Sequence, residues 1–281
     1  MEILTFWQNI PLQIDPVIFS IGNLSIRWYS LGYLLALLTI YFFLKRQLKS
    51  QKKPFITLDK LENILLIGFF GALLGGRIGY TIFYSWPDFL NDPFSIFWPF
   101  DQNGNFVGLY GMSFHGGLIG ALLAGWLICR KYKISFLEVL NFIIPVFPLG
   151  YFWGRLGNFF NGELYGRITE SGIGMHFPDQ PALLRHPSQI YEAIGEGLIL
   201  FFILKYFSRK QYWSDKIFPL FLLFYGIIRF LIEFLREPDP QLGLIVWQLT
   251  MGQLLSLVMI FTGSLILFLQ NKSGTYSDSD S

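Results

Sequence analysis

The sequence predicts an all-α, polytopic integral membrane protein with seven transmembrane helices and a small extracytoplasmic cap segment. The first observation behind this fold class is composition: of 281 residues, 53% are hydrophobic and only 14% are charged. A soluble domain usually carries about a quarter charged residues. The second is that apolar stretches approaching the roughly 20 residues needed to cross a bilayer recur along the whole chain.

Seven stretches are long and apolar enough to be spans. They lie at about 26–44, 62–83, 109–129, 136–153, 189–207, 217–235 and 247–269. Lysine and arginine gather in the connections 45–53, 130–133 and 205–216, which the positive-inside rule places in the cytoplasm. The connection at 84–108 contains neither residue and is expected outside. The N-terminus is therefore expected outside and the C-terminus in the cytoplasm.

We expect residues 1–272 to form a single membrane domain. The segment at about 155–188, in which glycine and proline recur and Asp179 lies between Pro178 and Pro181, is expected to form the extracytoplasmic cap. Residues 273–281, rich in serine and aspartate, are expected to be a disordered cytoplasmic tail. The single cysteine, Cys129, allows no internal disulfide and is interpreted as a buried thiol rather than a nucleophile.

The stretch 154–166 at the end of the fourth predicted span is the most informative part of the chain. It combines an arginine, two asparagines and a glutamate with four glycines. Polar side chains are costly in hydrocarbon, so these groups are expected to face protein, water or a ligand. Glycines also let the backbone approach another group closely.

Ionisable residues in or beside the spans share one depth. With the predicted topology, six of them fall in the outer half of the membrane: Arg27, Arg77, His115, Arg155, Glu192 and Arg229. Arginine binds phosphate or carboxylate through two parallel hydrogen bonds, and this outer cluster contains no lysine. Glu163 and Glu233 supply part of the opposite charge, with Glu233 one helical turn beyond Arg229. The pattern suits a phosphate head group that enters from the outer leaflet.

Structural alternatives exist for each of these residues. Arg27 is equally consistent with a side chain that snorkels to the interface, and Arg155 and Arg229 with ion pairs between helices. His115 lies among small residues, where a neutral imidazole can accept a proton, although a hydrogen bond between helices is the alternative. His186, beside Pro187 at a helix start, is interpreted as a helix cap rather than a catalytic residue.

The stretch 154–166 and six further segments carry a family resemblance. The further segments are 26–29, 75–80, 114–117, 186–192, 225–229 and 251–253. Through them the chain resembles bacterial prolipoprotein diacylglyceryl transferases over nearly its whole length. The resemblance implies transfer of the diacylglyceryl group of phosphatidylglycerol to the lipobox cysteine thiol of prolipoproteins. A thioether forms and glycerol phosphate is released, which is the first step of lipoprotein maturation.

The resemblance also implies a location and a set of partners. It implies a multi-pass enzyme of the bacterial cytoplasmic (inner) membrane whose active site opens toward the outer face. The partners are phosphatidylglycerol, prolipoprotein signal peptides with a lipobox cysteine, and membrane lipid. No nucleic acid, metal or other cofactor is implied.

Roles follow from the chemistry of this reaction. We expect His115 to take the thiol proton, or to orient the group that does, and Arg155 and Arg229 to hold charge on the leaving phosphate. The expected substrate-binding residues are Tyr29, Arg77, Tyr80, Asn158, Asn161, Glu163, Gly166, Tyr225 and Glu233. A lipid or anion transporter, a scaffolding membrane protein and an acyltransferase acting on a lipid hydroxyl are the alternatives.

Overall fold

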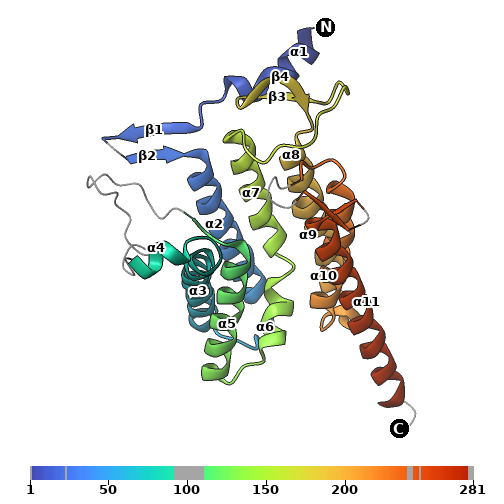
Figure 1. Cartoon of the computed structure of the whole chain (residues 1–281). Helices are drawn as coiled ribbons and strands as arrows, with labels where there is room; N and C mark the ends of the chain where they lie inside the picture. The colour runs from blue at the N-terminus through green and yellow to red at the C-terminus, as the bar shows by residue number, and fades with distance from the viewer. Residues whose placement is uncertain (1, 23, 92–110, 239–242, 247, 278–281) are drawn as a thin grey trace. The chain divides into compact units, whose positions relative to one another are not determined.

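The computed structural model describes residues 2–22, 24–91, 111–238, 243–246 and 248–277. These residues are mostly helical and include three two-stranded sheets (Figure 1). The helices are α1 (Glu2–Asn9), η1 (Ile10–Gln13), α2 (Trp28–Lys49), α3 (Leu58–Tyr84), α4 (Trp86–Asn91), α5 (Phe114–Tyr132), α6 (Phe136–Ile143), α7 (Phe147–Phe160), α8 (Ser188–Glu192), π-helical η3 (Ala193–Ile199), α9 (Leu200–Ser208), η4 (Gln211–Trp213), α10 (Ile217–Ile232) and α11 (Met251–Ser277). The strands are β1 (Val17–Ile21), β2 (Leu24–Arg27), β3 (Met175–Phe177), β4 (Gln180–Arg185), β5 (Leu244–Val246) and β6 (Leu249–Thr250).

Helices long and apolar enough to cross a membrane are present in the described part of the chain. Three helices qualify alone, over Trp28–Lys49, Leu58–Tyr84 and Met251–Lys272. The bent pair α6 and α7 makes a fourth if it forms one span. Together they indicate a multi-pass membrane protein. Helix α10 is a shorter apolar helix of 16 residues.

The fourth predicted span is a broken helix. Its halves α6 and α7 are bent by 54°, and Pro145 lies in the break. Proline has no backbone N–H and crowds the preceding turn, so it interrupts a helix, whereas Pro148 is tolerated at the start of α7. Because α7 continues to Phe160, Arg155 lies inside this helix rather than at the end of a span.

Other boundaries also differ from the sequence-based expectation. Arg27 ends strand β2, and the first long helix begins one residue later. The last span likewise begins with a strand, β6, before α11 starts at Met251. Helix α11 continues to Ser277, into the segment for which the sequence predicts a disordered tail; residues 278–281 lie outside the described part. The all-α expectation omitted the three short hairpins, because strands this short carry little periodic signal.

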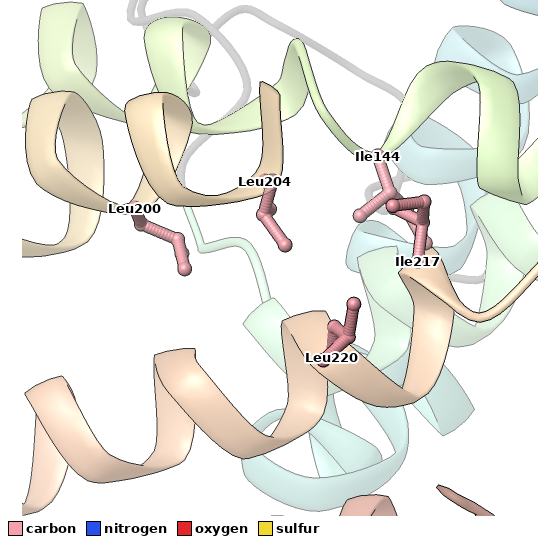
Figure 2. Close-up of a cluster of buried hydrophobic side chains, with 5 residues drawn as sticks. All are labelled: Ile144, Leu200, Leu204, Ile217 and Leu220. Atoms are coloured by element: carbon pink, nitrogen blue, oxygen red, sulfur yellow. The ribbon is translucent and has the colours of Figure 1, made fainter. Parts of the chain in front are cut away.

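The chain divides into two compact units. The first unit comprises Met1–Phe19, Ser25–Leu44 and Leu140–Ser281, and the second comprises Ser20–Leu24 and Lys45–Val139. In the first unit, Leu200 and Leu204 of α9 meet Ile217 and Leu220 of α10, with Ile144 from the α6–α7 break (Figure 2). This apolar cluster fixes α9 and α10 beside each other and so positions the polar residues farther along both elements.

The predicted cap segment contains a small hairpin in the first unit. Strands β3 and β4 pair antiparallel, with Met175 opposite Arg185. Met175 and Phe177 are buried against Phe159 near the end of α7. Helix α1 lies beside this hairpin (Figure 1), and its Trp7 Nε1 donates a 3.1 Å hydrogen bond to the Ile173 carbonyl.

In the second unit, α3 and α5 pack against each other through glycines. Helices α3 and α5 approach so closely that a Cβ at Gly71 would lie 2.6 Å from the Gly120 carbonyl oxygen. A Cβ at Gly79 would likewise lie 2.9 Å from the Cα of Gly116. Small residues at such spacing let membrane helices pack backbone to backbone.

Candidate active site

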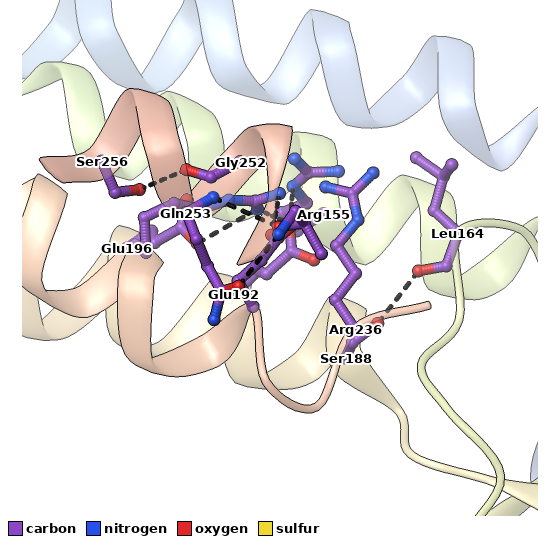
Figure 3. Close-up of polar contacts among 12 residues, drawn as sticks. Arg155, Leu164, Ser188, Glu192, Glu196, Arg236, Gly252, Gln253 and Ser256 are labelled. Atoms are coloured by element: carbon purple, nitrogen blue, oxygen red, sulfur yellow. Dashed lines mark hydrogen bonds and ion pairs between the residues drawn. The ribbon is translucent and has the colours of Figure 1, made fainter. Parts of the chain in front are cut away.

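Arg155 and Arg229 meet at one buried carboxylate in the first unit. Glu192 Oε2 lies 2.7 Å from Arg155 Nε and 3.1 Å from Arg229 Nη1 (Figure 3). It also accepts a 3.1 Å hydrogen bond from the Tyr151 hydroxyl. The Glu192 side chain has no exposed surface, and two arginines and a tyrosine gather at this one oxygen of a carboxylate that would otherwise be very costly to bury. Helix α7, the α8–η3 run and α10 each supply a member.

Two further carboxylates enclose Arg229. Its Nη1 lies 3.4 Å from Glu196 Oε1, and its Nη2 lies 2.7 Å from Glu233 Oε2. Thr250 fixes the other oxygen of Glu233 with a 2.9 Å hydrogen bond from its hydroxyl. A Cβ at Gly252 would lie 2.5 Å from that oxygen, so the carboxylate packs directly against the backbone of this glycine. The predicted pairing of Arg229 with Glu233 is therefore present.

Arg155 has a different environment. Its Nε donates to the Tyr151 hydroxyl at 2.7 Å, and its guanidinium lies 4.7 Å from the centre of that ring. Its Nη1 donates to Asn158 Oδ1 at 3.3 Å. Among the described residues, Nη2 of Arg155 has no hydrogen-bond partner. Arg155 thus keeps donors for a ligand, while Arg229 faces carboxylates on several sides.

The asparagines and glutamate of the stretch 154–166 extend this cluster. Asn158 Nδ2 donates to Glu163 Oε1 at 2.8 Å, and Asn161 Nδ2 reaches the same oxygen at 3.5 Å. Tyr225 packs its ring edge-on against Tyr151, with centroids 6.4 Å apart. The structure therefore brings together seven of the predicted site residues: Arg155, Asn158, Asn161, Glu163, Tyr225, Arg229 and Glu233.

Tyr29 lies beside the same helix. A Cβ at Gly157 would lie 3.3 Å from the Cα of Tyr29, so α2 and α7 approach closely one residue before Asn158. The Tyr29 hydroxyl lies 2.8 Å from the Tyr33 hydroxyl. This predicted substrate-binding residue is thus held next to the asparagine and arginine of α7.

Gly166 is explained by close packing. Its N–H donates to the His186 carbonyl at 2.7 Å, and a Cβ would collide with the Leu235 carbonyl oxygen. The interpretation of His186 as a helix cap is wrong: α8 has Pro187 at its N-cap and no side-chain cap. Its Nδ1 instead lies 3.3 Å from the Tyr191 hydroxyl. Burial lowers the pKa of the His186 imidazole.

The other predicted site residues belong to the second unit. Arg77 donates from Nη1 to the Gly111 carbonyl at 3.0 Å, and the Tyr80 ring fills the space where a Cβ of Gly111 would lie. His115 lies in the first turn of α5, with its side chain exposed and its ring 5.7 Å from that of Phe114. Arg77 and Tyr80 therefore both contact Gly111, and His115 lies four residues later in the chain, in α5.

Glu192, Glu196 and Tyr151 were missing from the predicted site. The sequence placed Glu192 at the common depth without assigning it a role. Glu196 stands between two glycines in an otherwise apolar stretch, which is a signal for function inside a membrane. Tyr151 precedes Arg155 by four residues on α7, and this spacing places them on one helix face. The π-helical segment η3, which carries Glu196, has no signature that we could read from the sequence.

The sequence predicted that Glu163 and Glu233 supply part of the charge opposite to the arginines, and Glu233 does contact Arg229. Three buried carboxylates, those of Glu192, Glu196 and Glu233, face the guanidinium groups of Arg155 and Arg229. Several arginines can share one depth because carboxylates lie between them. No group of three or more His, Cys, Asp or Glu side chains that could hold a metal occurs among the described residues.

Comparison with known proteins decides the family. A family model described as prolipoprotein diacylglyceryl transferase matches residues 16–269. The chain belongs to this family. A phosphatidylglycerol–prolipoprotein diacylglyceryl transferase of Chlorobaculum tepidum is 48% identical over 273 residues, covering 95% of this chain and 93% of the relative. Proteins of the same name from Rickettsia conorii and Idiomarina loihiensis are 44% and 45% identical, covering 92% and 93% of this chain and 97% and 94% of the relatives.

Family membership and the apolar helices agree on a multi-pass membrane protein. The matched residues include α7, the α8–η3 run and α10 in full, so the buried ion-pair cluster lies within the part that the family model covers.

Proposed function

We propose that this protein is a transferase that moves the diacylglyceryl group of phosphatidylglycerol to the lipobox cysteine thiol of prolipoproteins. The reaction forms a thioether, releases glycerol phosphate and begins lipoprotein maturation. The observation that carries the proposal is the identity of 44–48% over more than 90% of the chain to relatives named for this activity. The Arg155–Glu192–Arg229 cluster supports it, because the reaction needs fixed cations beside a phosphate.

In the proposed reaction, the cysteine sulfur attacks the glycerol carbon that carries the phosphate ester. A carbon–sulfur bond forms and the carbon–oxygen bond breaks, and the electron pair leaves with the phosphate oxygen. The thiol must lose its proton, since the thiolate is the nucleophile. His115 accepts this proton, or orients the group that does; its exposed position at the start of α5 leaves the ring open to a substrate.

Arg155 holds the leaving phosphate through the donors that the protein leaves free. Its Nε and one Nη1 hydrogen are already directed at Glu192, Tyr151 and Asn158, so the guanidinium plane is fixed before substrate binds. Such preorganised donors stabilise developing charge at no reorganisation cost. Arg229, within bonding distance of three carboxylates, contributes positive potential and holds Glu192 in place.

The remaining candidates have binding or supporting roles. Asn158 and Asn161 orient ester or glycerol oxygens. Glu163 holds these two asparagines in position, and Glu233 holds Arg229. Tyr29 and Tyr225 offer hydroxyl groups beside α7 and α10. Arg77, Tyr80 and Gly166 complete the proposed substrate-binding set. The proposal requires no metal or other cofactor.

The topology is part of the proposal. Adding α5, the α8–η3–α9 run and α10 to the four candidate spans gives seven, with the N-terminus outside and the C-terminus cytoplasmic. The protein then lies in the bacterial inner membrane as a single domain over 1–272, with its active site toward the outer face. The cap segment, about 155–188, covers that face, and 273–281 form the tail.

The purified protein in detergent, incubated with phosphatidylglycerol and a lipobox peptide, tests the activity. Mass spectrometry of the peptide should show a diacylglyceryl increment on the cysteine, with glycerol phosphate released. A peptide with serine in place of the cysteine is the control and should stay unmodified. An unmodified cysteine peptide, with folded protein that binds phosphatidylglycerol, would instead favour lipid transport.

A further inference from the structure

The turn after α7 has an unusual backbone conformation. Gly162 has φ +69° and Leu164 has φ +59°. Glycine adopts this left-handed region freely, and here it ends the helix with two hydrogen bonds, Gly162 N–H to Phe159 O and Glu163 N–H to Asn158 O, each 3.0–3.1 Å. Leu164 has a Cβ and is disfavoured there, so the surrounding contacts must hold this turn.

Two fully buried side chains supply those contacts. The Ser188 hydroxyl donates to the Leu164 carbonyl at 3.0 Å (Figure 3), and Gln189 Nε2 donates to the Glu163 carbonyl at 2.6 Å. Both residues are 0% exposed and open helix α8. They therefore fix two successive carbonyl groups of the strained turn.

The fixed turn connects to Arg155. Glu163 accepts from Asn158 at 2.8 Å, and Asn158 accepts from Arg155 Nη1 at 3.3 Å. One turn after Gln189, the same helix presents Glu192, which lies 2.7 Å from Arg155 Nε. The contacts form a closed ring in which α8 holds Arg155 twice, directly through Glu192 and indirectly through the turn.

We infer that Ser188 and Gln189 are positioning residues for Arg155. They hold the Glu163–Leu164 turn so that Glu163 fixes Asn158, and Asn158 fixes one edge of the guanidinium that receives the phosphate. The inference rests on the proposed function for its catalytic consequence, and on the contacts alone for its structural one.

Gln189 acts as a hydrogen-bond donor to the Glu163 carbonyl. Its acceptor atom Oε1 is buried with no hydrogen-bond partner among the described residues, so Nε2 is the atom that makes its contact. Gln189→Met keeps the length of the side chain and removes the donor. Ser188→Ala removes the second contact, and Ser188→Thr restores a hydroxyl.

Diacylglyceryl transfer measured with purified full-length variants tests the catalytic consequence. Gln189→Met should lower kcat about tenfold with a much smaller change in KM, the loss typical of one hydrogen bond that orients a reacting group. In a Glu163→Ala background, which breaks the link to Asn158, the same substitution should add less than about twofold. Another tenfold loss in that background would overturn the inference, as would full activity of Gln189→Met.

Hydrogen-exchange mass spectrometry tests the structural consequence without any assay of activity. The peptide covering 161–166 should exchange faster in Gln189→Met and in Ser188→Ala, and near the wild-type rate in Ser188→Thr. Gln211→Met, at an exposed position, is the matched control and should leave this peptide unchanged. Unchanged exchange in Gln189→Met would show that Gln189 does not hold the Glu163–Leu164 turn. If the wild-type protein transfers nothing, the proposed function fails. The exchange result still decides whether Ser188 and Gln189 hold the Glu163–Leu164 turn.

Discussion

Glu192 occupies the position on which both arginines depend. One of its oxygens contacts Arg155, Arg229 and Tyr151, and the side chain has no access to solvent. Without this carboxylate, two guanidinium groups would repel each other in a poorly hydrated site. Glu196, four residues later, contacts only one of the two arginines, at the longer distance of 3.4 Å. These two glutamates therefore form a natural pair for comparison.

Glu192→Gln should be far more damaging than Glu196→Gln. The first variant keeps the shape but leaves two buried arginines short of a counter-charge, and removing one partner of a buried ion pair typically costs about 3–5 kcal/mol. We expect a lower Tm and transfer activity reduced at least ~100-fold, in line with loss of a preorganised charge contact. Thermal unfolding in detergent and the peptide assay measure both effects. Equal losses in the two variants would contradict the central role of Glu192.

Lysine should not replace either arginine. Arg155 uses Nε and Nη1 for separate partners, and Arg229 uses Nη1 and Nη2 for separate carboxylates. A single ammonium group cannot reproduce this fork. Arg155→Lys and Arg229→Lys should each lose nearly as much activity as the alanine variants, about 10²–10³-fold. Wild-type rates in both lysine variants would refute the geometric argument.

At the scale of elements, irregular helices build the site. The break at Pro145 ends α6 and lets α7 start anew, and α7 then carries Tyr151, Arg155 and Asn158 on one side. The π-helical η3 follows α8 directly and carries Glu196. Single π-turns inside helices are frequent at functional sites. A regular α-helix at the α6–α7 break or at η3 would direct the polar side chains that follow toward different faces.

Packing of α3 on α5 depends on glycine at particular positions. A Cβ at Gly71 would lie 2.5 Å from the Ala124 Cβ, whereas one at Gly68, on the same helix, meets nothing within 4 Å. Gly71→Leu should therefore separate the helices and lower both the Tm and the yield of folded protein. Gly68→Leu should leave both near wild type. Similar Tm values for the two variants would show that α3 and α5 do not pack this closely.

At the scale of the whole molecule, the two compact units carry different parts of the proposed machinery. The first contains the buried cluster of Arg155, Glu192 and Arg229, and the second contains Arg77, Tyr80 and His115. In the proposed reaction, the base belongs to the second unit and the phosphate-binding arginine to the first. Each unit is stabilised by its own contacts.

The proposed topology makes a labelling prediction. In a Cys129→Ala background, Ser171→Cys in the cap segment and Ser214→Cys in a cationic connection provide one exposed thiol each. In intact spheroplasts, a membrane-impermeant maleimide should label the first and not the second. Lysis should expose the second. Labelling of Ser214→Cys before lysis would contradict the predicted orientation.

Several candidate site residues could be predicted from the sequence because their chemistry is conspicuous along the chain. Arginine, asparagine and glutamate in an apolar stretch are costly, so Arg155, Asn158, Glu163, Arg229 and Glu233 stand out without any fold. The spacing of Arg229 and Glu233 even predicted their contact, because four residues make one helical turn. Hydropathy likewise located the three long apolar helices and the bent pair of α6 and α7.

The tertiary structure decided which charges meet. Glu192 bridges Arg155 and Arg229 across three elements, and no spacing along the chain encodes that contact. The strained Leu164 turn and its contacts with Ser188 and Gln189 are likewise set by how α7 packs on α8. Sequence determined the residue types and the local helical faces, since these depend on near neighbours. Pairings between distant segments depend on packing, which only the folded chain defines.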